Sequence, residues 1–235
     1  MNLVKKLFPS AFAEKIGGMK DYYLHFEKYK SPWGAQFNNQ QLRTKIFDAI
    51  IKKGLVDFIV ETGTFRGTTT DYFLTATGYP IYSVELDVRS FYFSKCRFRK
   101  SKRVTLFNDD SRSFLNYLVT QKALKSRNIF FYLDAHWNDD LPLVQELEII
   151  MKNWENYIVM IDDFKVDNDP GYDYDIYNGQ SLELTLLNPL KQYYYKAYFP
   201  INSTNETGAK RGSIILTGSE KIANELNLIA ELIKA

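Results

Sequence analysis

Polar side chains and glycines gather at five points of this 235-residue sequence, each directly after an apolar run. The first point, residues 61–69, reads ETGTFRGTT and places Gly63 four positions before Gly67. Glycines permit a tight turn and the close approach of a ligand, and a helix N-terminus with nearby hydroxyls can hold an anion such as a carboxylate. The pattern indicates a ligand-binding turn, and an ordinary strand-to-helix turn is the alternative.

The second of these five places in the sequence has a carboxylate at position 85. Glu85 ends the next apolar run, 24 positions after Glu61. In dinucleotide-binding folds a carboxylate at this place accepts both hydroxyls of a ribose. The Gly-x-Gly-x-x-Gly pattern of NAD-binding turns is absent, because position 65 is Phe, and the sequence has no Lys-Ser or Lys-Thr phosphate-binding loop. The sequence therefore favours a nucleoside ligand and argues against NAD and ATP.

Aspartates follow the next three apolar runs, as Asp110-Ser111, Asp134 and Asp162-Asp163. The last three carboxylates suit a hard cation such as Mg²⁺, which binds oxygen ligands and keeps positions open for water and substrate. Residues 129–190 contain thirteen acidic and two basic side chains, a net charge of −11, and such a block repels itself unless cations or hydrogen bonds compensate it. Helix capping is the alternative role for Asp110 and for Asp162-Asp163.

One histidine stands close to these carboxylates. His136 lies two positions after Asp134. Imidazole titrates near neutral pH and is the commonest general base. We therefore regard His136 as a candidate catalytic base, with a structural role as the alternative.

Alternating strand and helix patterns begin near residue 40 and determine where these side chains lie. Buried parallel strands read as continuous apolar runs, and helices as apolar residues three and four positions apart. The predicted strands are Asp57–Val60, Ile81–Glu85, Val104–Phe107, Ile129–Leu133, Tyr157–Ile161, Tyr193–Phe199 and Ser213–Leu216. The predicted helices are Gln41–Lys53, Thr68–Thr77, Val88–Arg99, Ser113–Leu124 and Leu141–Trp154.

Helices between successive strands predict right-handed crossovers and hence an α/β fold with a doubly wound, mostly parallel, seven-stranded Rossmann-like sheet. The last two strands lack an intervening helix and predict an antiparallel pair. Ligands of such sheets bind beyond the carboxyl ends of the strands, where all five polar points lie. Residues 1–40 are expected to form an N-terminal extension, as a lid or a homo-oligomer contact, and residues 41–235 the binding domain.

The composition fits one soluble globular domain. Its 30 Lys and Arg against 28 Asp and Glu give a net charge of +2, too small to indicate a nucleic-acid partner. A single cysteine, Cys96, excludes an internal disulfide, and two histidines exclude a His-rich metal site, so we expect a cytoplasmic protein. No apolar run approaches the roughly 20 residues of a membrane span.

Taken together, the five points resemble the motifs of the class I S-adenosylmethionine-dependent methyltransferases, and more narrowly those of the divalent-metal-dependent O-methyltransferases. ETGTFRG at residues 61–67 and LDAHW at residues 133–137 are similar to segments of catechol O-methyltransferase. IDDF at residues 161–164 resembles the macrocin-type enzymes, which methylate sugar hydroxyls of natural products. The match covers about residues 40–217 and rests on five motifs in order.

The resemblance implies a cofactor site for S-adenosylmethionine. Glu61, Gly63 and Gly67 would lie against the cofactor. Thr64 or Thr69 would lie near its methionine carboxylate. Glu85 would hold the ribose, while Asp110 and Ser111 would meet the adenine.

The resemblance also implies a metal and catalytic site, with Mg²⁺ or Mn²⁺ bound by Asp134, Asp162 and Asp163. The lysine base of catechol O-methyltransferase has no counterpart after LDAHW in this chain, which leaves His136 as the leading candidate. Asp134 and His136 are thus the expected catalytic residues.

We accordingly expect metal-assisted transfer of a methyl group to a hydroxyl oxygen of a small molecule, with a sugar or glycoside suggested by the resemblance. A bound metal would lower the pKa of the acceptor and align its oxygen with the methyl group. Two loops, Trp33–Gln40 and Val166–Gln180, are expected to shape the pocket. A nucleotide-dependent oxidoreductase on a Rossmann-like sheet and a non-catalytic S-adenosylmethionine-binding protein remain as alternatives.

Overall fold

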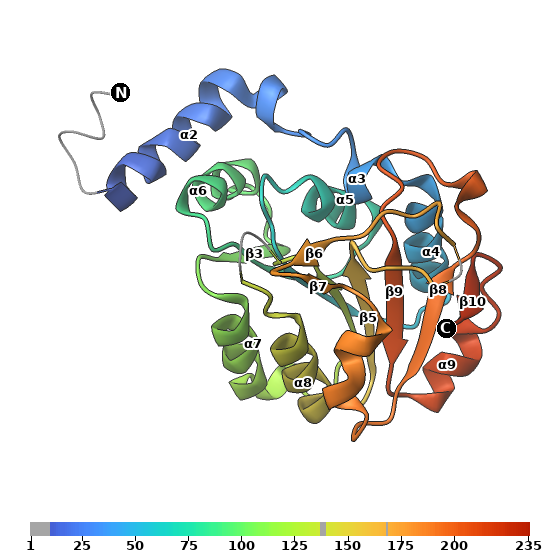
Figure 1. Cartoon of the computed structure of the whole chain (residues 1–235). Helices are drawn as coiled ribbons and strands as arrows, with labels where there is room; N and C mark the ends of the chain where they lie inside the picture. The colour runs from blue at the N-terminus through green and yellow to red at the C-terminus, as the bar shows by residue number, and fades with distance from the viewer. Residues whose placement is uncertain (1–9, 137–139, 168) are drawn as a thin grey trace.

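Apolar strands form the middle layer of a three-layer α/β fold (Figure 1). The computed structural model describes residues 10–136, 140–167 and 169–235. The α-helices are α2 (Ser10–Tyr29), α3 (Gln36–Asn39), α4 (Gln41–Lys52), α5 (Thr68–Ala76), α6 (Val88–Arg97), α7 (Ser111–Thr120), α8 (Leu143–Asn153) and α9 (Glu220–Leu226). The 3₁₀ helices are η1 (Lys122–Leu124), η2 (Leu184–Leu190) and η3 (Ser203–Asn205).

The polar residues singled out in the sequence lie at the carboxyl ends of the parallel strands. The strands of the sheet are β1 (Phe58–Thr62), β2 (Ile81–Val84), β3 (Val104–Phe107), β4 (Ile129–Leu133), β5 (Tyr157–Asp162), β8 (Lys196–Pro200), β9 (Ser213–Thr217) and β10 (Leu232–Lys234), with β6 (Ile176–Tyr177) and β7 (Gln180–Ser181) in a separate hairpin. Thr62 pairs with Val84 of β2 and with Leu133 of β4, and Leu133 pairs with Ile161 of β5. The residues that follow these strands therefore leave the sheet side by side.

The predicted doubly wound sheet is confirmed, but seven is the wrong number of strands. Within the described residues the sheet has eight strands in the order β10-β8-β9-β5-β4-β1-β2-β3. Neighbouring strands from β5 to β3 run parallel, and β9 lies antiparallel to both β5 and β8, which confirms the antiparallel C-terminal pair. The extra strand, β10, pairs antiparallel with β8 at the edge. Its three residues include one buried side chain, Leu232, so no periodic pattern marks it.

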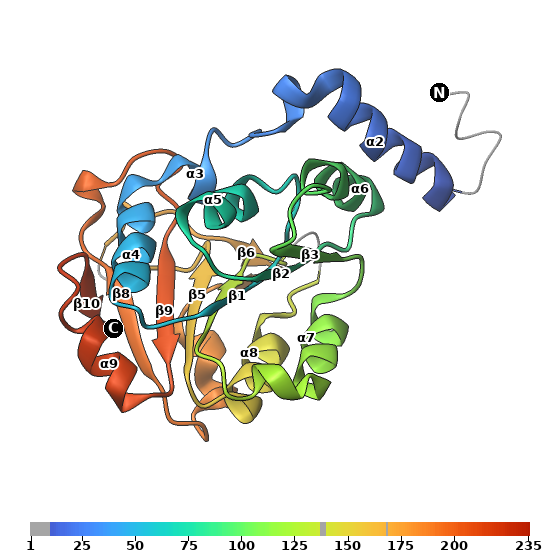
Figure 2. The ribbon, with the colours of Figure 1, turned by 180° about the vertical axis from the view of Figure 1, so that it is seen from behind.

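Side chains of each central strand alternate between two apolar layers, as expected for a sheet covered on both faces. On one face Phe131 of β4 packs with residues of α7, α8 and η2. On the other face Phe130 packs with residues of α4, α5 and α9. Figure 2 shows the same layers from behind, with α4 and α5 on the side of the sheet opposite α7 and α8.

Helix α2 lies outside these layers and packs along α6 (Figures 1 and 2). The two helices approach closely at Gly18, where an added Cβ would lie 2.2 Å from the carbonyl oxygen of Arg89. The buried Asp21 carboxylate accepts two hydrogen bonds from Arg89, at 2.7 and 2.9 Å, and one from Arg66 at 3.1 Å. The predicted N-terminal extension therefore includes a helix held by an ion-pair network, and its residues 1–9 lie outside the described residues.

Across residues 10–136, 140–167 and 169–235, no helix is both long enough and apolar enough to cross a bilayer.

Candidate functional site

A cavity of about 900 Å³ opens at the carboxyl ends of β1, β2, β4 and β5. All predicted site residues except Gly67 and Asp162 line it. The N-terminal segment also contributes to its wall through Trp33, Ala35 and Asn38. This is the position at which open α/β sheets bind their ligands.

The turn after β1 needs both of its glycines because other parts of the chain pack against them. Gly63 has a φ of +90°, and a Cβ there would lie 2.1 Å from the carbonyl oxygen of Asp134. Gly67 has a φ of +72°, and a Cβ there would lie 2.5 Å from the ring of Phe98. A side chain at either position would push the turn away from its neighbours. The glycines thus fix the turn between the ends of β1 and β4 and the start of α5.

Glu61 forms the buried floor of the cavity. Its Oε2 accepts hydrogen bonds from the hydroxyls of Thr70 and Ser83, each at 2.5 Å. Burial raises the pKa of Glu61 to about 7, against the effect of these two donors. The side chain is therefore fixed in place between β1, β2 and α5.

Glu85 lies at the rim of the same cavity and is 9% exposed. Its two carboxylate oxygens accept hydrogen bonds from the backbone N–H groups of Phe65, at 2.6 Å, and Asp87, at 2.7 Å. Burial raises its pKa to about 7. Because each carboxylate oxygen can accept two hydrogen bonds, both oxygens keep the capacity to accept one from a ribose hydroxyl.

Asp110 caps helix α7, as one of its two predicted roles requires. Its carboxylate accepts from the backbone N–H of Arg112, at 2.9 Å, and from that of Ser113, at 3.4 Å. The Arg112 guanidinium, which donates to the same carboxylate, lowers its pKa. Asp110 and Ser111 line the cavity together with Asp109, an exposed carboxylate that no sequence motif marked.

The two threonines assigned to the cofactor carboxylate both have protein partners. The Thr64 hydroxyl lies 2.5 Å from that of Ser83, and the Thr69 hydroxyl oxygen accepts from the backbone N–H of Phe37 at 3.3 Å. Phe37 belongs to α3, so Thr69 connects the start of α5 to the N-terminal segment. Both threonines line the cavity.

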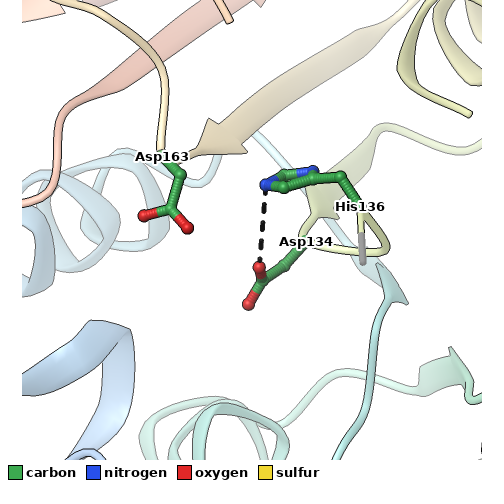
Figure 3. A group of neighbouring side chains, drawn as sticks. All are labelled: Asp134, His136 and Asp163. Atoms are coloured by element: carbon green, nitrogen blue, oxygen red, sulfur yellow. Dashed lines mark ion pairs between the residues drawn. The ribbon is translucent and has the colours of Figure 1, made fainter. Parts of the chain in front are cut away.

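Asp134, His136 and Asp163 come together on the other side of the cavity (Figure 3). One potential ligand atom of each residue lies within 4.8 Å of the other two. Figure 3 shows the three side chains pointing toward a common space from the ends of β4 and β5. Burial, with the negative charges of Asp162 and Asp163, raises the pKa of Asp134 well above its usual value. Burial and the Asp162 charge raise the pKa of Asp163 to about 7.

His136 is 3% exposed, and neither ring nitrogen has a hydrogen-bond partner within the part of the chain that the structure describes. Its Nε2 lies 4.0 Å from Oδ1 of Asp134. The ring of Tyr177 packs edge-on against the imidazole at 5.6 Å. Burial lowers the pKa of His136, so the ring is neutral at pH 7. Trp137, the last residue of the LDAHW segment, lies outside the described residues.

Asp162 does not join this group. Its carboxylate is fully buried and ion-paired with Arg43 of α4, and it accepts from the Tyr132 hydroxyl at 2.6 Å and from the backbone N–H of Asp163 at 2.7 Å. Burial favours a higher pKa for Asp162, but the Arg43 charge and the Tyr132 hydrogen bond hold it below its usual value. The structure thus places Asp162 beneath the cavity, whereas Asp163 and Asp134 line it.

Some residues of the cavity wall carried no signal in the sequence. Arg211 donates to Asp163 from Nε, at 2.7 Å, and pairs with Asp175. Asp175 also accepts from the Tyr177 hydroxyl at 2.8 Å. Asp175 and Tyr177 lie in the Val166–Gln180 loop that was expected to shape the pocket, but nothing marked Arg211 or Arg43.

Three solved structures that are similar to this chain are methyltransferases. The O-methyltransferase TomG from Streptomyces achromogenes, involved in tomaymycin synthesis and solved with S-adenosylmethionine, has a TM-score of 0.56 at 12% identity over 89% of this chain and 90% of its own. The O-methyltransferase from Bacillus cereus, solved with S-adenosylhomocysteine, has a TM-score of 0.52 at 14% identity over 89% of this chain and 92% of its own. The methyltransferase domain of a bacterial Hen1 protein has a TM-score of 0.52 at 14% identity over 75% of this chain and 98% of its own.

The chain has the fold of these methyltransferases. No family model matches the sequence, and no curated protein matches it. At these identities the likeness concerns the fold, so the activity has to be argued from the cavity.

Proposed function

We propose that this protein transfers a methyl group from S-adenosylmethionine to a hydroxyl oxygen of a small molecule. The proposal rests on the cavity at the carboxyl ends of the strands. One half of it is suited to bind a nucleoside, and the other half is suited to bind a methyl acceptor. Glu85, Asp110 and Ser111 line the first half, and Asp134, His136 and Asp163 the second. The cofactor-bound methyltransferases of the same fold support this assignment.

In this proposal the chain positions both reactants. The β1–α5 turn holds the methionine part of the cofactor, with Thr64 or Thr69 near its carboxylate, and Glu85 accepts hydrogen bonds from the ribose. Glu61 fixes the floor below. Holding donor and acceptor in line within one cavity converts a bimolecular encounter into an oriented step, which supplies much of the rate enhancement.

We also propose that the reaction is metal-assisted. A divalent cation, when bound, lowers the pKa of a coordinated hydroxyl and holds its oxygen in place. The donors present fit such an ion, because partial burial and the charge of Asp162 raise the pKa of both Asp134 and Asp163, and His136 has unpartnered nitrogens among the described residues. A neutral imidazole here can accept the acceptor's proton, the role that the sequence favours, or bind the cation.

The acceptor half suits a hydroxyl-rich ligand, and we propose a sugar or glycoside. Asp175, Tyr177 and Asn38 line this part of the cavity with carboxylate, phenol and amide groups. Such groups donate to and accept from hydroxyls. We place the reaction in the cytoplasm, where a protein whose single cysteine is free needs no oxidising environment.

Helix α2 supports a further proposal, that the protein associates with a second copy of itself. The apolar side chains of Ile16, Met19 and Leu24 on α2 are 37%, 38% and 67% exposed. Gly18 and Asp21 form the side of α2 that packs against α6. A helix that is apolar on its solvent side usually buries that side against a partner.

Protection against unfolding and labelled-methyl transfer together test the proposed function. S-adenosylhomocysteine should raise the melting temperature, whereas NAD at equal concentration should not. Transfer of labelled methyl to a panel of sugars and phenols should stop with chelator and return with a divalent cation. Protection by NAD alone would favour an oxidoreductase. Binding of S-adenosylmethionine without transfer to any acceptor would favour a protein without turnover, and full transfer in excess chelator would remove the metal from the mechanism.

A further inference from the structure

The group at the carboxyl ends of β4 and β5 offers one nitrogen and two oxygen donors, from His136, Asp134 and Asp163 (Figure 3). We infer that His136 is a metal ligand, and that the site selects a divalent transition ion of the Mn²⁺, Fe²⁺, Co²⁺ and Zn²⁺ class over Mg²⁺. The inference rests on the proposed function for the place of this ion in the reaction. It concerns the chemistry of the ion and the role of the imidazole.

The burial of His136 is the first argument. Its side chain is 1% exposed, and neither Nδ1 nor Nε2 has a hydrogen-bond partner among the residues that the structure describes. Burying polar atoms without a partner costs free energy, and native proteins rarely leave a whole ring unsatisfied. A cation bound by one nitrogen would give that nitrogen a partner without moving the ring.

The positions of the donors are the second argument. Nε2 of His136 lies 4.0 Å from Oδ1 of Asp134, and the group of three ligand atoms spans at most 4.8 Å. Ligand atoms at about 2.1 Å from one octahedral ion are about 3 Å apart, so small side-chain rotations suffice to bring the three together. Edge-on packing against Tyr177 holds the imidazole plane.

The engagement of Asp162 is the third argument. Both of its oxygens already have partners, in Arg43, Tyr132 and the backbone N–H of Asp163. Its buried ion pair with Arg43 neutralises the charge that a cation would need. Without Asp162, the carboxylates that face the group are Asp134 and Asp163, and the third protein ligand is the imidazole nitrogen.

A donor set of this kind discriminates between metals. Mg²⁺ takes oxygen ligands, whereas imidazole suits Fe²⁺, Ni²⁺, Cu²⁺ and Zn²⁺, and affinity for nitrogen-containing sites rises from Mn²⁺ through Co²⁺ to Cu²⁺. An imidazole that binds a cation through one nitrogen cannot also accept the acceptor's proton at that nitrogen. We therefore assign His136 to the metal and not to general-base catalysis.

Metal titrations of the full chain, first freed of metal with a chelator, test this assignment without any methyl donor. Calorimetry with CoCl₂ and MgCl₂ should give a Co²⁺ affinity at least about 100-fold above that for Mg²⁺. The variant His136→Ala should bind Co²⁺ at least about tenfold more weakly and change its visible absorption, and its Mg²⁺ affinity should change little. The control His25→Ala removes the other histidine, which is exposed on α2, and should leave both affinities unchanged.

A measurement on the unmodified protein covers the case in which His136→Ala fails to fold. Pulsed electron paramagnetic resonance of the Mn²⁺-loaded chain should show coupling to a ¹⁴N nucleus from the bound imidazole. Equal affinities for Co²⁺ and Mg²⁺, an unchanged Co²⁺ spectrum in folded His136→Ala, or the absence of nitrogen coupling would each overturn the inference.

These outcomes are separable from failure of the proposed function. Nitrogen-coupled Mn²⁺ in a protein that neither binds S-adenosylhomocysteine nor transfers methyl groups would overturn the function and support the inference. Methyl transfer that works with Mg²⁺ bound through oxygen alone would support the proposed function and overturn the inference.

Discussion

Glu85 is the residue whose assignment to the cofactor is simplest to test. Its carboxylate is held by two backbone N–H groups and keeps one acceptor site on each oxygen. Glu85→Ala should weaken S-adenosylhomocysteine binding by about 1.5–3 kcal/mol, the usual contribution of hydrogen bonds to a charged group. Calorimetry measures the loss, with Glu27→Ala on the exposed surface of α2 as the control. An affinity equal to that of the unmodified chain would remove Glu85 from the ribose site.

Replacement by asparagine should affect stability differently at Asp162 and at Asp163, the adjacent aspartates at the end of β5. Asp162→Asn leaves the Arg43 guanidinium buried without a charged partner, which typically costs about 3–5 kcal/mol of stability. Asp163→Asn removes one of several mutually repelling carboxylates, and Arg211 keeps its ion pair with Asp175, so the protein should stay folded.

Two measurements separate the pair. Urea unfolding should show the stability loss in Asp162→Asn alone, and calorimetry should show loss of divalent-cation binding in folded Asp163→Asn. Equal stabilities for the two variants would contradict the structural role of the Asp162–Arg43 pair. Undiminished metal affinity in Asp163→Asn would remove that residue from the metal group.

At the residue scale, the sequence predicted which side chains reach the cavity better than it predicted what each one does there. Asp134, Asp163, Glu85 and Asp110 line the cavity because each follows a parallel strand, and strand ends meet at one edge. Asp162 and Asp163 are adjacent in the sequence, and nothing there tells which of them faces Arg43. That distinction depends on α4, which lies more than 100 positions away in the chain.

Helix α8 contributes a buried carboxylate that should make stability depend on pH. Glu146 is fully buried, and burial raises its pKa from 4.5 to about 7. The hydroxyls of Ser111 and Thr62 lower that pKa, but neither forms a hydrogen bond of normal geometry with the carboxylate among the described residues. Between pH 4.5 and 7 the folded protein therefore keeps a proton that the unfolded chain has lost. Stability from this group accordingly falls as the pH rises through that window.

Replacement of Glu146 by glutamine should remove this dependence. The free energy of unfolding of the unmodified chain should fall between pH 5 and pH 8. In Glu146→Gln this fall should be smaller by about 2–3 kcal/mol, at roughly 1.4 kcal/mol per pKa unit. Urea unfolding at the two pH values measures this, with Glu148→Gln, exposed on the same helix, as the control. An identical pH dependence in all three proteins would mean that Glu146 is already ionised in the folded state at pH 5.

At the element scale, the core strands and helices were predictable and the peripheral ones were not. Strands β1 to β5 are continuous apolar runs with buried side chains, apart from the half-exposed β3, and the sequence marked all five. The predicted helix Ser113–Leu124 is instead α7 followed by the 3₁₀ turn η1, because Asp110 caps the helix at Ser111 and Gln121 adopts an extended conformation. The short strands β6, β7 and β10 are too brief to show any period.

For the whole molecule, the outer face of α2 predicts self-association. The part of α2 before its kink at His25, from Ser10 to Leu24, spans roughly 22 Å at about 1.5 Å per residue, enough to support a two-fold contact in which each copy presents the same apolar face. Light scattering at micromolar concentration should show a dimer, and the double substitution Ile16→Asp with Met19→Asp should give a folded monomer. Both side chains are more than a third exposed, so the substitution should not disturb the packing of α2 on α6. A monomeric unmodified chain would contradict the proposed contact.

We propose that S-adenosylmethionine binds at the carboxyl ends of β1 to β4, with its methyl group directed toward Asp134, His136 and Asp163. The most direct test is a crystal structure of the protein grown with S-adenosylhomocysteine. We predict density for the ligand in the cavity, with the ribose hydroxyls on Glu85, the adenine beside Asp110 and Ser111, and the sulfur facing the metal group. An empty cavity at saturating ligand, or a ligand bound elsewhere on the molecule, would contradict the account.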